Sequence, residues 1–331
     1  MKFTHAAMAL ALSGVLAGLA AQPAAAKEVT IAVASTFTTM DPYDASDTLS
    51  YSAAKSMYEG LFGFFIRKIN KLIIPFLFFY LSAFFLKYIV WKIVPGVFQL
   101  PVSWTELLVV FHDHALIKFN PPIWFLLALF NCNILFYLVH SLRNRRLGLM
   151  FALTLLIGTA GFYMGKHQIE LPLYMDVAMS ALPFYVAGFW IRRYNFFLFP
   201  HRFDKLIPLC ILAALAVMYF TATFVGMRTN NYAGNIFQFW ASAFAGIFMI
   251  MLFCKKFKKL PVISYMGRYS VITLGIHAPL LHFEYPVVSR FIHNEWGQAI
   301  ALLLLTLTVC IIATPIFLKL IPQAVAQKDF I

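Results

Sequence analysis

The chain has 331 residues, of which 62% are hydrophobic and only 12% are charged, and its formal net charge is +13. A soluble domain has about 25% charged residues, so this composition excludes an ordinary soluble protein and indicates a chain embedded in lipid. The positive charge does not indicate a nucleic-acid partner, because the Lys and Arg residues lie in short clusters between apolar runs.

Residues 1–26 have the organisation of a secretory signal peptide. Lys2 and His5 form a basic start, an apolar stretch follows at 6–20, and small residues ending at Ala26 offer a cleavage site. The apolar stretch is short for a membrane span of about 20 residues, so we expect a cleaved leader and not a first transmembrane helix.

Residues 27–64 have the character of a short soluble segment. A β-branched run at 29–33 predicts a strand, an Asp-Pro turn follows at 40–44, and a helical pattern ends in Tyr-x-Gly-Leu-Phe at Phe62. With the leader, these features resemble the start of periplasmic solute-binding proteins of peptide and glutathione ABC importers. The resemblance implies an exported binding component, but a segment this short cannot enclose such a ligand alone.

From residue 72 onward, eight apolar runs are each long enough to cross a bilayer core of about 30 Å at about 1.5 Å of rise per residue. We therefore predict an all-α polytopic membrane protein with about eight transmembrane helices. The predicted spans are 72–94, 122–140, 147–164, 171–190, 206–226, 233–253, 269–291 and 298–321.

The connections between these runs alternate between basic and weakly charged. The basic connections are 66–71, 143–146, 192–205 and 255–268. The others, which are poorer in Lys and Arg, are 95–121, 165–170, 227–232 and 292–297. By the positive-inside rule, the basic connections and the C-terminus are expected in the cytoplasm.

The two parts of the chain make conflicting topological demands. A signal peptide places residues 27–64 outside the cytoplasm, yet the basic segment 66–71 follows with no span between them. We interpret the conflict as a join of two unrelated reading frames near Phe64.

Four short patterns follow one another in the apolar part of the chain. They are Leu-Ile-Ile-Pro after Lys71, Pro-Pro-Ile-Trp-Phe-Leu around Trp124, Leu-Pro-Phe-Tyr-Val-Ala-Gly at 182–188, and Gly-Arg-Tyr-Ser with a later His at 267–277. Together they resemble the acyltransferase-3 family of membrane acyltransferases. Members have about ten spans, so the resemblance implies that a domain over residues 65–331 lacks the family's first two spans.

The resemblance implies a membrane O-acyltransferase that takes an acyl group, expected to be acetyl, from a cytoplasmic acyl-CoA. The acceptor would be a hydroxyl of a cell-envelope sugar or glycan, and the location the bacterial inner membrane. The expected partners are the lipid bilayer, acyl-CoA and the glycan, with no permanently bound cofactor. A periplasmic solute-binding component and a non-enzymatic transporter are the alternatives.

In the family, an Arg in the first span is followed eleven positions later by a His that serves as the acid or base. No Arg of this sequence has a His at that distance. Because a hydroxyl acceptor needs a base within hydrogen-bond reach, the catalytic residue stays unassigned and we expect little activity.

The family's basic motif at the cytoplasmic mouth is thought to hold the phosphates of the acyl donor. Lys68 and Lys71 match this motif with lysines, and Arg67 stands beside them. A lysine can bind a phosphate as a point charge. The alternative is that these three residues only set topology, as any basic loop would.

Three further residues are candidates for the site. His277 and Asp176 fall inside predicted spans, where an ionisable side chain is a functional candidate by default. A structural hydrogen bond to a neighbouring helix is the alternative for His277. Trp124 opens a span, where a role as an interfacial anchor is sufficient. Glu284 also falls in a predicted span, and we expect it near the external interface.

We expect no metal site. The histidines His112 and His114 lack a third ligand nearby. The four cysteines lie in or at the ends of apolar runs without metal-ligand spacing, so packing is their expected role. They are Cys132, Cys210, Cys254 and Cys310.

Overall fold

The computed structural model describes residues 61–93, 104–107, 120–141, 147–194, 205–257 and 260–329. The chain divides into two compact units, Met1–Gly60 and Leu61–Ile331, and every described residue belongs to the second. The predicted signal peptide at 1–26, and the predicted soluble segment at 27–64 up to residue 60, therefore lie outside the described residues.

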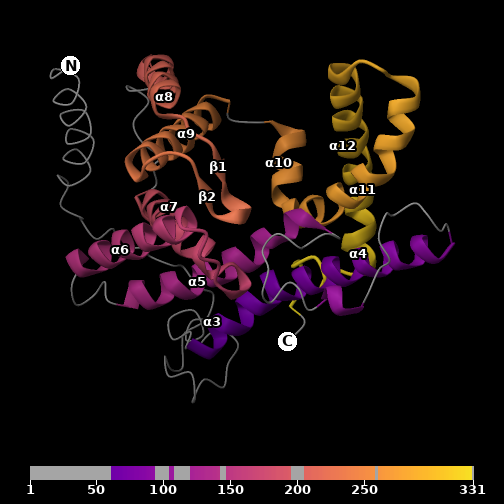
Figure 1. Ribbon diagram of the computed structural model, residues 1–331, viewed down its shortest axis with the longest axis horizontal. Coiled ribbons are helices and arrows are strands. Elements are labelled where there is room, and N and C mark those ends of the chain that lie inside the picture. The colour runs from indigo at the N-terminus through magenta and orange to yellow at the C-terminus, as the bar shows by residue number, and fades with distance from the viewer. Residues whose placement is uncertain are drawn as a thin grey trace, which may run out of the picture. The chain divides into compact units, whose positions relative to one another are not determined.

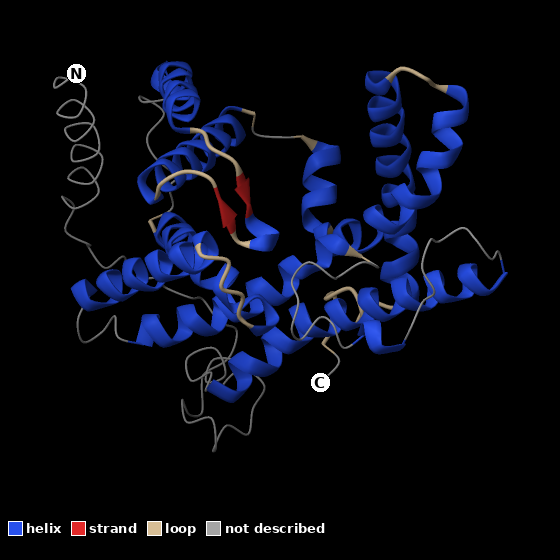
Figure 2. Ribbon diagram, in the orientation of Figure 1, coloured by secondary structure: helices blue, strands red, loops and turns tan. Residues whose placement is uncertain are grey.

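The described part of the chain is almost entirely helical, as predicted (Figures 1 and 2). The helices are α3 (Leu61–Lys68), α4 (Ile74–Ile93), α5 (Trp124–Ser141), α6 (Leu147–Lys166), α7 (Met175–Arg193), α8 (Ile207–Thr221), α9 (Ile236–Lys256), α10 (Pro261–Arg268), α11 (Ser270–Phe291) and α12 (Glu295–Leu320). Two short antiparallel strands, β1 (Val225–Gly226) and β2 (Asn231–Tyr232), form a hairpin between α8 and α9.

Within the described ranges, seven helices are long and apolar enough to cross a membrane. They are Gly63–Ile93, Pro121–Ser141, Leu147–Lys166, Pro172–Arg193, Ile236–Lys256, Ser270–Phe291 and Glu295–Leu320. The prediction of about eight such helices is therefore too high by one.

The predicted fifth span, 206–226, contains a helix that is shorter than predicted. Its helix, α8, has only 15 residues, which corresponds to about 22 Å at 1.5 Å per residue. The chain leaves the helix at Ala222, whose backbone is extended, and continues into β1. Residues 222–226 are mostly apolar, but hydrophobicity alone does not distinguish the end of a helix from the start of a strand.

The first span begins earlier than predicted, because the basic segment is helical. Residues from Gly63 to Ile93 form one continuous helix, with a single π-helical turn at Ile69–Ile73. In a regular α-helix, the ring of Pro75 would press on the carbonyl of Lys71. The wider turn, in which the Ile74 N–H bonds to the carbonyl of Ile69, accommodates this proline.

Helices that follow one another pack in pairs: α6 against α7, α8 against α9, and α11 against α12, while α5 also packs against α7. The largest buried cluster joins α4, the start of α5, the start of α7 and α11. Its members include Leu72, Phe76, Phe79, Phe84, Ile123, Leu126, Tyr174, Val177, Ile272 and Val325.

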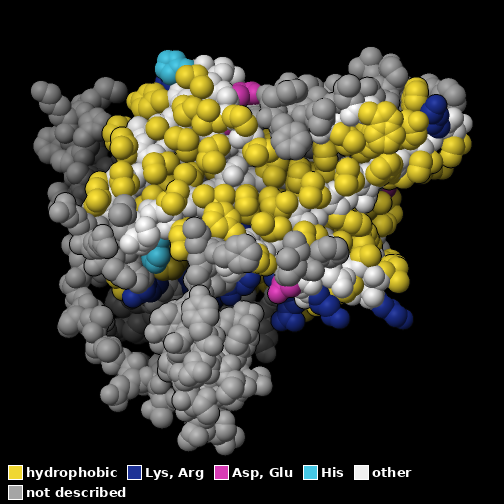
Figure 3. Space-filling view, turned by 90° about the horizontal axis from the view of Figure 1, so that it is seen from below, with side chains coloured by type: hydrophobic (Ala, Val, Ile, Leu, Met, Phe, Trp, Pro, Cys, Tyr) yellow, Lys and Arg dark blue, Asp and Glu magenta, His cyan; other side chains and the backbone are white. Residues whose placement is uncertain are grey.

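Large apolar side chains also cover the outside of the helices. Leu209, Leu212 and Phe220 on α8 are exposed, as are Ile300 and Leu304 on α12. Figure 3 shows hydrophobic side chains across a broad continuous face, with most of its Lys and Arg side chains along one border. A soluble monomer rarely exposes an apolar surface of this extent, so the surface is one that lipid covers.

Candidate functional site

The basic segment lies at the N-terminal end of the first span. Arg67 and Lys68 close α3, and Lys71 lies in the π-helical turn. The ammonium of Lys68 lies 5.3 Å from the ring centroid of Phe64, a cation–π contact. Asn70, between the two lysines, is 1% exposed. The turn therefore directs an amide into the protein and leaves Lys71 partly in water.

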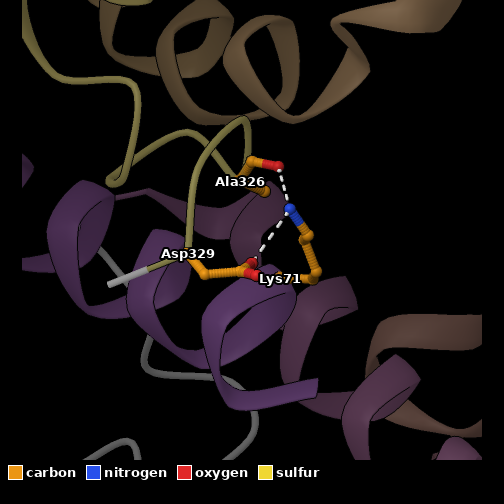
Figure 4. A network of polar contacts seen from close by, with 3 residues as sticks. All are labelled: Lys71, Ala326 and Asp329. Atoms are coloured by element: carbon orange, nitrogen blue, oxygen red, sulfur yellow. Dashed lines mark hydrogen bonds and ion pairs between the residues drawn. The ribbon is translucent and has the colours of Figure 1, made fainter. Parts of the chain in front are cut away.

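Lys71 contacts the C-terminal end of the chain (Figure 4). Its Nζ donates a hydrogen bond to the carbonyl oxygen of Ala326 at 2.8 Å. The same Nζ lies 3.4 Å from Oδ1 of Asp329, with the two side chains 44% and 58% exposed. The sequence-based candidate Lys71 thus already binds two oxygen atoms, one of them anionic.

The entry to α7 has an unusual backbone. Leu173 and Tyr174 have φ angles of 58° and 62°, a left-handed conformation that residues with a Cβ adopt at an energetic cost. The side-chain amide of Asn131 donates to the carbonyl oxygen of Leu173 at 2.6 Å. Strained backbone of this kind is found where surrounding contacts enforce it, and functional sites are one such place.

Trp124 and Asp176 each have a partner at this strained entry. The Trp124 ring lies 5.8 Å from the ring of Tyr174, centroid to centroid. Asp176 is fully buried, and its Oδ1 accepts a hydrogen bond from the backbone N–H of Leu171 at 3.4 Å. Trp124 therefore packs against a second aromatic ring inside the protein. The sequence analysis had expected only an anchoring role at the membrane interface.

His277 lies in α11 and is half-buried. Its Nδ1 is 2.8 Å from the carbonyl oxygen of Thr273, one turn earlier in the same helix. A carbonyl only accepts, so Nδ1 donates, and Nε2 carries the lone pair of the neutral ring. The bond of His277 is thus made to its own helix and not to a neighbouring one.

Four of the sequence-based candidates surround one buried cluster. Each of the four candidates is the direct sequence neighbour of a residue that belongs to this cluster or packs against it. The pairs are Lys71 with Leu72, Trp124 with Ile123, Asp176 with Val177, and His277 with Ile276. Asn120 ties two parts of it together, because its Nδ2 donates to the carbonyl oxygen of Gly275 at 2.6 Å. The structure therefore gathers these four residues around one core.

Sequence analysis did not identify the polar network around Asn230. This residue lies between the β1–β2 strands and is 1% exposed. Its Nδ2 donates to the carbonyl oxygen of Gly161 at 3.0 Å, while its Oδ1 accepts from Ser180 Oγ at 3.0 Å and from the hydroxyl of Tyr232 at 2.7 Å. The network fixes the hairpin to α6 and α7. No local sequence signal could have paired residues this far apart.

Burial raises the pKa of Tyr232 to about 12. The hydrogen-bonding Ser180 hydroxyl opposes this rise, and the nearby carboxylate of Asp176 adds to it. The phenol is therefore neutral over the physiological range and can keep donating to Asn230.

Glu284, which the sequence analysis expected near the external interface, has a buried partner on the next helix. It is buried within α11, about 10 Å before the last residue of the helix at 1.5 Å per residue. Its Oε2 accepts a hydrogen bond from Oγ1 of Thr306 on α12. A carboxyl inside an apolar run indicates a buried partner, and that signal was available in the sequence.

No three His, Cys, Asp or Glu side chains come together as a possible metal site within the residues that the structure describes. The four cysteines are free thiols.

Comparisons with known proteins match two parts of the chain. The family model of the acyltransferase domain, acyltransferase 3, matches residues 50–315. Its match begins upstream of residue 65, where we predicted the start of this domain. No solved structure matches the chain at a significant level.

The N-terminal part is similar to glutathione-binding protein GsiB of several bacteria. It is 62% identical over 55 residues to the protein of Salmonella typhimurium (strain LT2), which is 16% of this chain and 11% of that protein. Against Pectobacterium atrosepticum the identity is 59% over 56 residues, or 17% of this chain and 11% of that protein. The chain thus spans about a tenth of the length of these curated relatives. Both resemblances found in the sequence are confirmed.

Proposed function

Because the chain belongs to the acyltransferase-3 family of multi-pass membrane acyltransferases, we propose that it binds an acyl-CoA through its basic segment. The acyl group, expected to be acetyl, would pass to a hydroxyl of a cell-envelope sugar or glycan in the bacterial inner membrane. Seven described helices of membrane-spanning length support the membrane setting of this proposal.

The donor part of the proposal depends on the two contacts that the ammonium of Lys71 makes. Its ammonium binds a carboxylate oxygen and a carbonyl oxygen at the end of a membrane span. The phosphates of CoA present the same kind of acceptor with a higher charge. Arg67 and Lys68 lie within one turn of Lys71 along the same helix, so three cationic groups gather at one end of the span.

The chemistry requires a base. The acceptor hydroxyl oxygen attacks the thioester carbonyl, the C–S bond breaks, and the hydroxyl proton passes to the base and then to the departing thiolate. The Arg and His pair that would supply this base in the family is absent from the sequence. We therefore propose that donor binding is retained while turnover is low.

The donor part can be tested by titrating CoA against the full chain in lipid nanodiscs. Replacing both lysines, as Lys68→Ala/Lys71→Ala, should weaken CoA binding by about tenfold or more, because hydrogen bonds to charged groups contribute about 1.5–3 kcal/mol. Lys166→Ala/Lys319→Ala is the matched control, since it removes two exposed lysines at the ends of α6 and α12. Equal losses in both double variants would mean that only overall charge matters.

The turnover part needs a separate measurement. Acetyl transfer from labelled acetyl-CoA in membranes should fall far below that of a family member whose first span contains the Arg and His pair. Comparable turnover in the two proteins would contradict the proposed impairment and leave the donor site standing.

The proposal also requires that the basic segment, residues 66–71, faces the cytoplasm. The alternation of basic and weakly charged connections supports a cytoplasmic position for residues 66–71, which is where acyl-CoA is found. Reporter fusions ending just after Lys71 should report the cytoplasm. An external position would mean that the leader sets the topology and would exclude a cytoplasmic donor at this site.

Glutathione binding is a second candidate, since the N-terminal part resembles proteins named for that ligand. The similarity covers about a tenth of those proteins, and a ligand of that size needs more enclosing surface. Equilibrium dialysis of the purified chain against labelled glutathione should detect no binding. Saturable binding would make this candidate the better one.

A further inference from the structure

The segment after α12 folds back onto the basic segment; residues 321–329 are called the C-terminal strap. Its backbone forms successive turns, in which the N–H groups of Gln327 and Lys328 both donate to the carbonyl oxygen of Pro322, at 2.9 and 3.2 Å. The strap is therefore an ordered structure and approaches Lys71 in a defined geometry.

One apolar side chain anchors the strap. Val325 is fully buried and belongs to the same cluster as Leu72, which lies in the π-helical turn, and Phe76, which follows it in α4. The next residue, Ala326, has a φ of 62°, a conformation that alanine rarely adopts. This conformation accompanies the hydrogen bond from Lys71 to the Ala326 carbonyl.

Asp329 completes the contact. Its carboxylate lies 3.4 Å from the ammonium of Lys71, so the strap presents to this lysine an anionic oxygen of the kind that a phosphate would present. The strap takes one hydrogen bond from this ammonium at Ala326 and pairs its charge with Asp329. A bound phosphate would therefore compete with the Asp329 carboxylate for the positive charge of Lys71.

The exposure of the pair makes this competition reversible. Both side chains are about half-exposed, and exposed ion pairs are worth little because water and salt screen them. The buried Val325, in contrast, can hold the strap in place after Asp329 has left. Val325, in the middle of the strap, is thus suited to anchoring it, and Asp329, at its end, is suited to exchange.

We propose that the C-terminal strap is an autoinhibitory gate over the donor site, in which Asp329 occupies Lys71 until the phosphates of acyl-CoA displace it. The proposal rests on the proposed function, since it takes Lys71 as a ligand of the donor. It adds that the site is regulated, because the side-chain carboxylate of Asp329 sets part of the affinity for the donor.

The test is a CoA titration with the full chain in lipid nanodiscs. Asp329→Asn should bind CoA about three- to fivefold more tightly than the natural chain, which is the range set by an exposed ion pair of up to about 1 kcal/mol. In a Lys71→Ala background the same substitution should have no effect, because the competition requires the lysine. Glu295→Gln, which removes an exposed carboxylate from the first turn of α12, should leave affinity unchanged.

The outcomes separate the gate from the donor site. If CoA binds in a manner that depends on Lys71 but Asp329→Asn binds no more tightly, the gate is wrong and the donor site stands. If Asp329→Asn and Glu295→Gln tighten binding equally, the effect is one of net charge and the gate is again wrong. If CoA does not bind at all, both proposals fail.

A second measurement does not depend on affinity. Saturating CoA should speed hydrogen exchange at the amides of the strap, including Gln327 and Lys328, while the amides of α12 stay protected. Unchanged or slower exchange in the strap would show that the donor does not displace it and would overturn the gate.

Discussion

Two non-helical segments fold back onto helices, and they are held in opposite ways. The β1–β2 hairpin attaches through Asn230, which is buried and has a partner for both atoms of its amide. The C-terminal strap attaches at Lys71 through a pair that is about half-exposed. Buried, fully satisfied hydrogen bonds are costly to break, whereas exposed ion pairs are not. The hairpin is thus part of the fold, and the strap is available for exchange.

The largest expected effect is at the hairpin. Asn230→Ala leaves the Gly161 carbonyl, Ser180 and Tyr232 without their partner, and it places alanine at a φ of 47°. We expect the free energy of unfolding to fall by about 2–4 kcal/mol, measured by thermal unfolding in nanodiscs. Asn231→Ala, at the exposed neighbouring position, is the control and should change stability by less than about 0.5 kcal/mol. Similar losses at the two positions would remove the contrast between hairpin and strap.

The pH dependence of Tyr232 tests the same attachment. Its pKa is raised from 10.0 to about 12 in the folded protein, so folding favours the neutral phenol. That stability is complete below pH 10 and is lost as the pH rises towards 12, which amounts to about 3 kcal/mol. Tyr232→Phe should flatten this part of the stability curve relative to the natural chain. If the free energy of unfolding fell equally with pH in both proteins, groups other than Tyr232 would cause the loss of stability at alkaline pH.

A crowding variant in α6 should have a comparable or smaller effect. The Cβ of Gly165→Ala would overlap the backbone oxygen of Asn230, so the hairpin must shift, at a cost of about 1–3 kcal/mol. Gly148→Ala in the same helix meets no atom within 4 Å and should be neutral or slightly stabilising. The difference between the two unfolding midpoints is the measurement. If Gly165→Ala proved neutral, the hairpin would be more mobile than its hydrogen bonds imply.

The smallest effect on stability is expected at the strap. Asp329→Asn should lower the free energy of unfolding by no more than about 1 kcal/mol, even though it is expected to change CoA affinity. High salt should reduce this loss further, since screening weakens exposed pairs. A loss as large as that of Asn230→Ala would make the strap a structural element and not a gate.

The sequence predicted what depends on long apolar runs and failed where residues distant in sequence meet. Seven spans follow from hydrophobic length, whereas α8 is shorter than its apolar run because the chain leaves the helix at Ala222 and forms a strand at Val225–Gly226. Lys71 was identified as a candidate from its motif. Its partner Asp329 could not be, because a single charge near the C-terminus has no pattern that points to a lysine 258 positions earlier.

Asn131 also shows what the sequence could and could not predict. Asn131 lies inside an apolar run, and its burial could be expected. Its bond to the carbonyl of Leu173 depends on how α5 and α7 pack, which no periodicity in either helix specifies. The positive φ angles of Leu173 and Tyr174 are equally unpredictable, since these residue types do not favour that conformation.

The shortness of α8 has a consequence for the lipid around it. The connections before α8 and after α9 are both basic, so the two helices are expected to return the chain to the same side of the membrane. A crossing helix of about 22 Å is roughly 8 Å shorter than the hydrocarbon core. If α8 crosses the bilayer, lipid beside it has to thin, and the exposed rings of Tyr219 and Phe220 near its end would lie at this depressed interface. Bilayers of shorter-chain lipids should match this part of the protein better than thick ones.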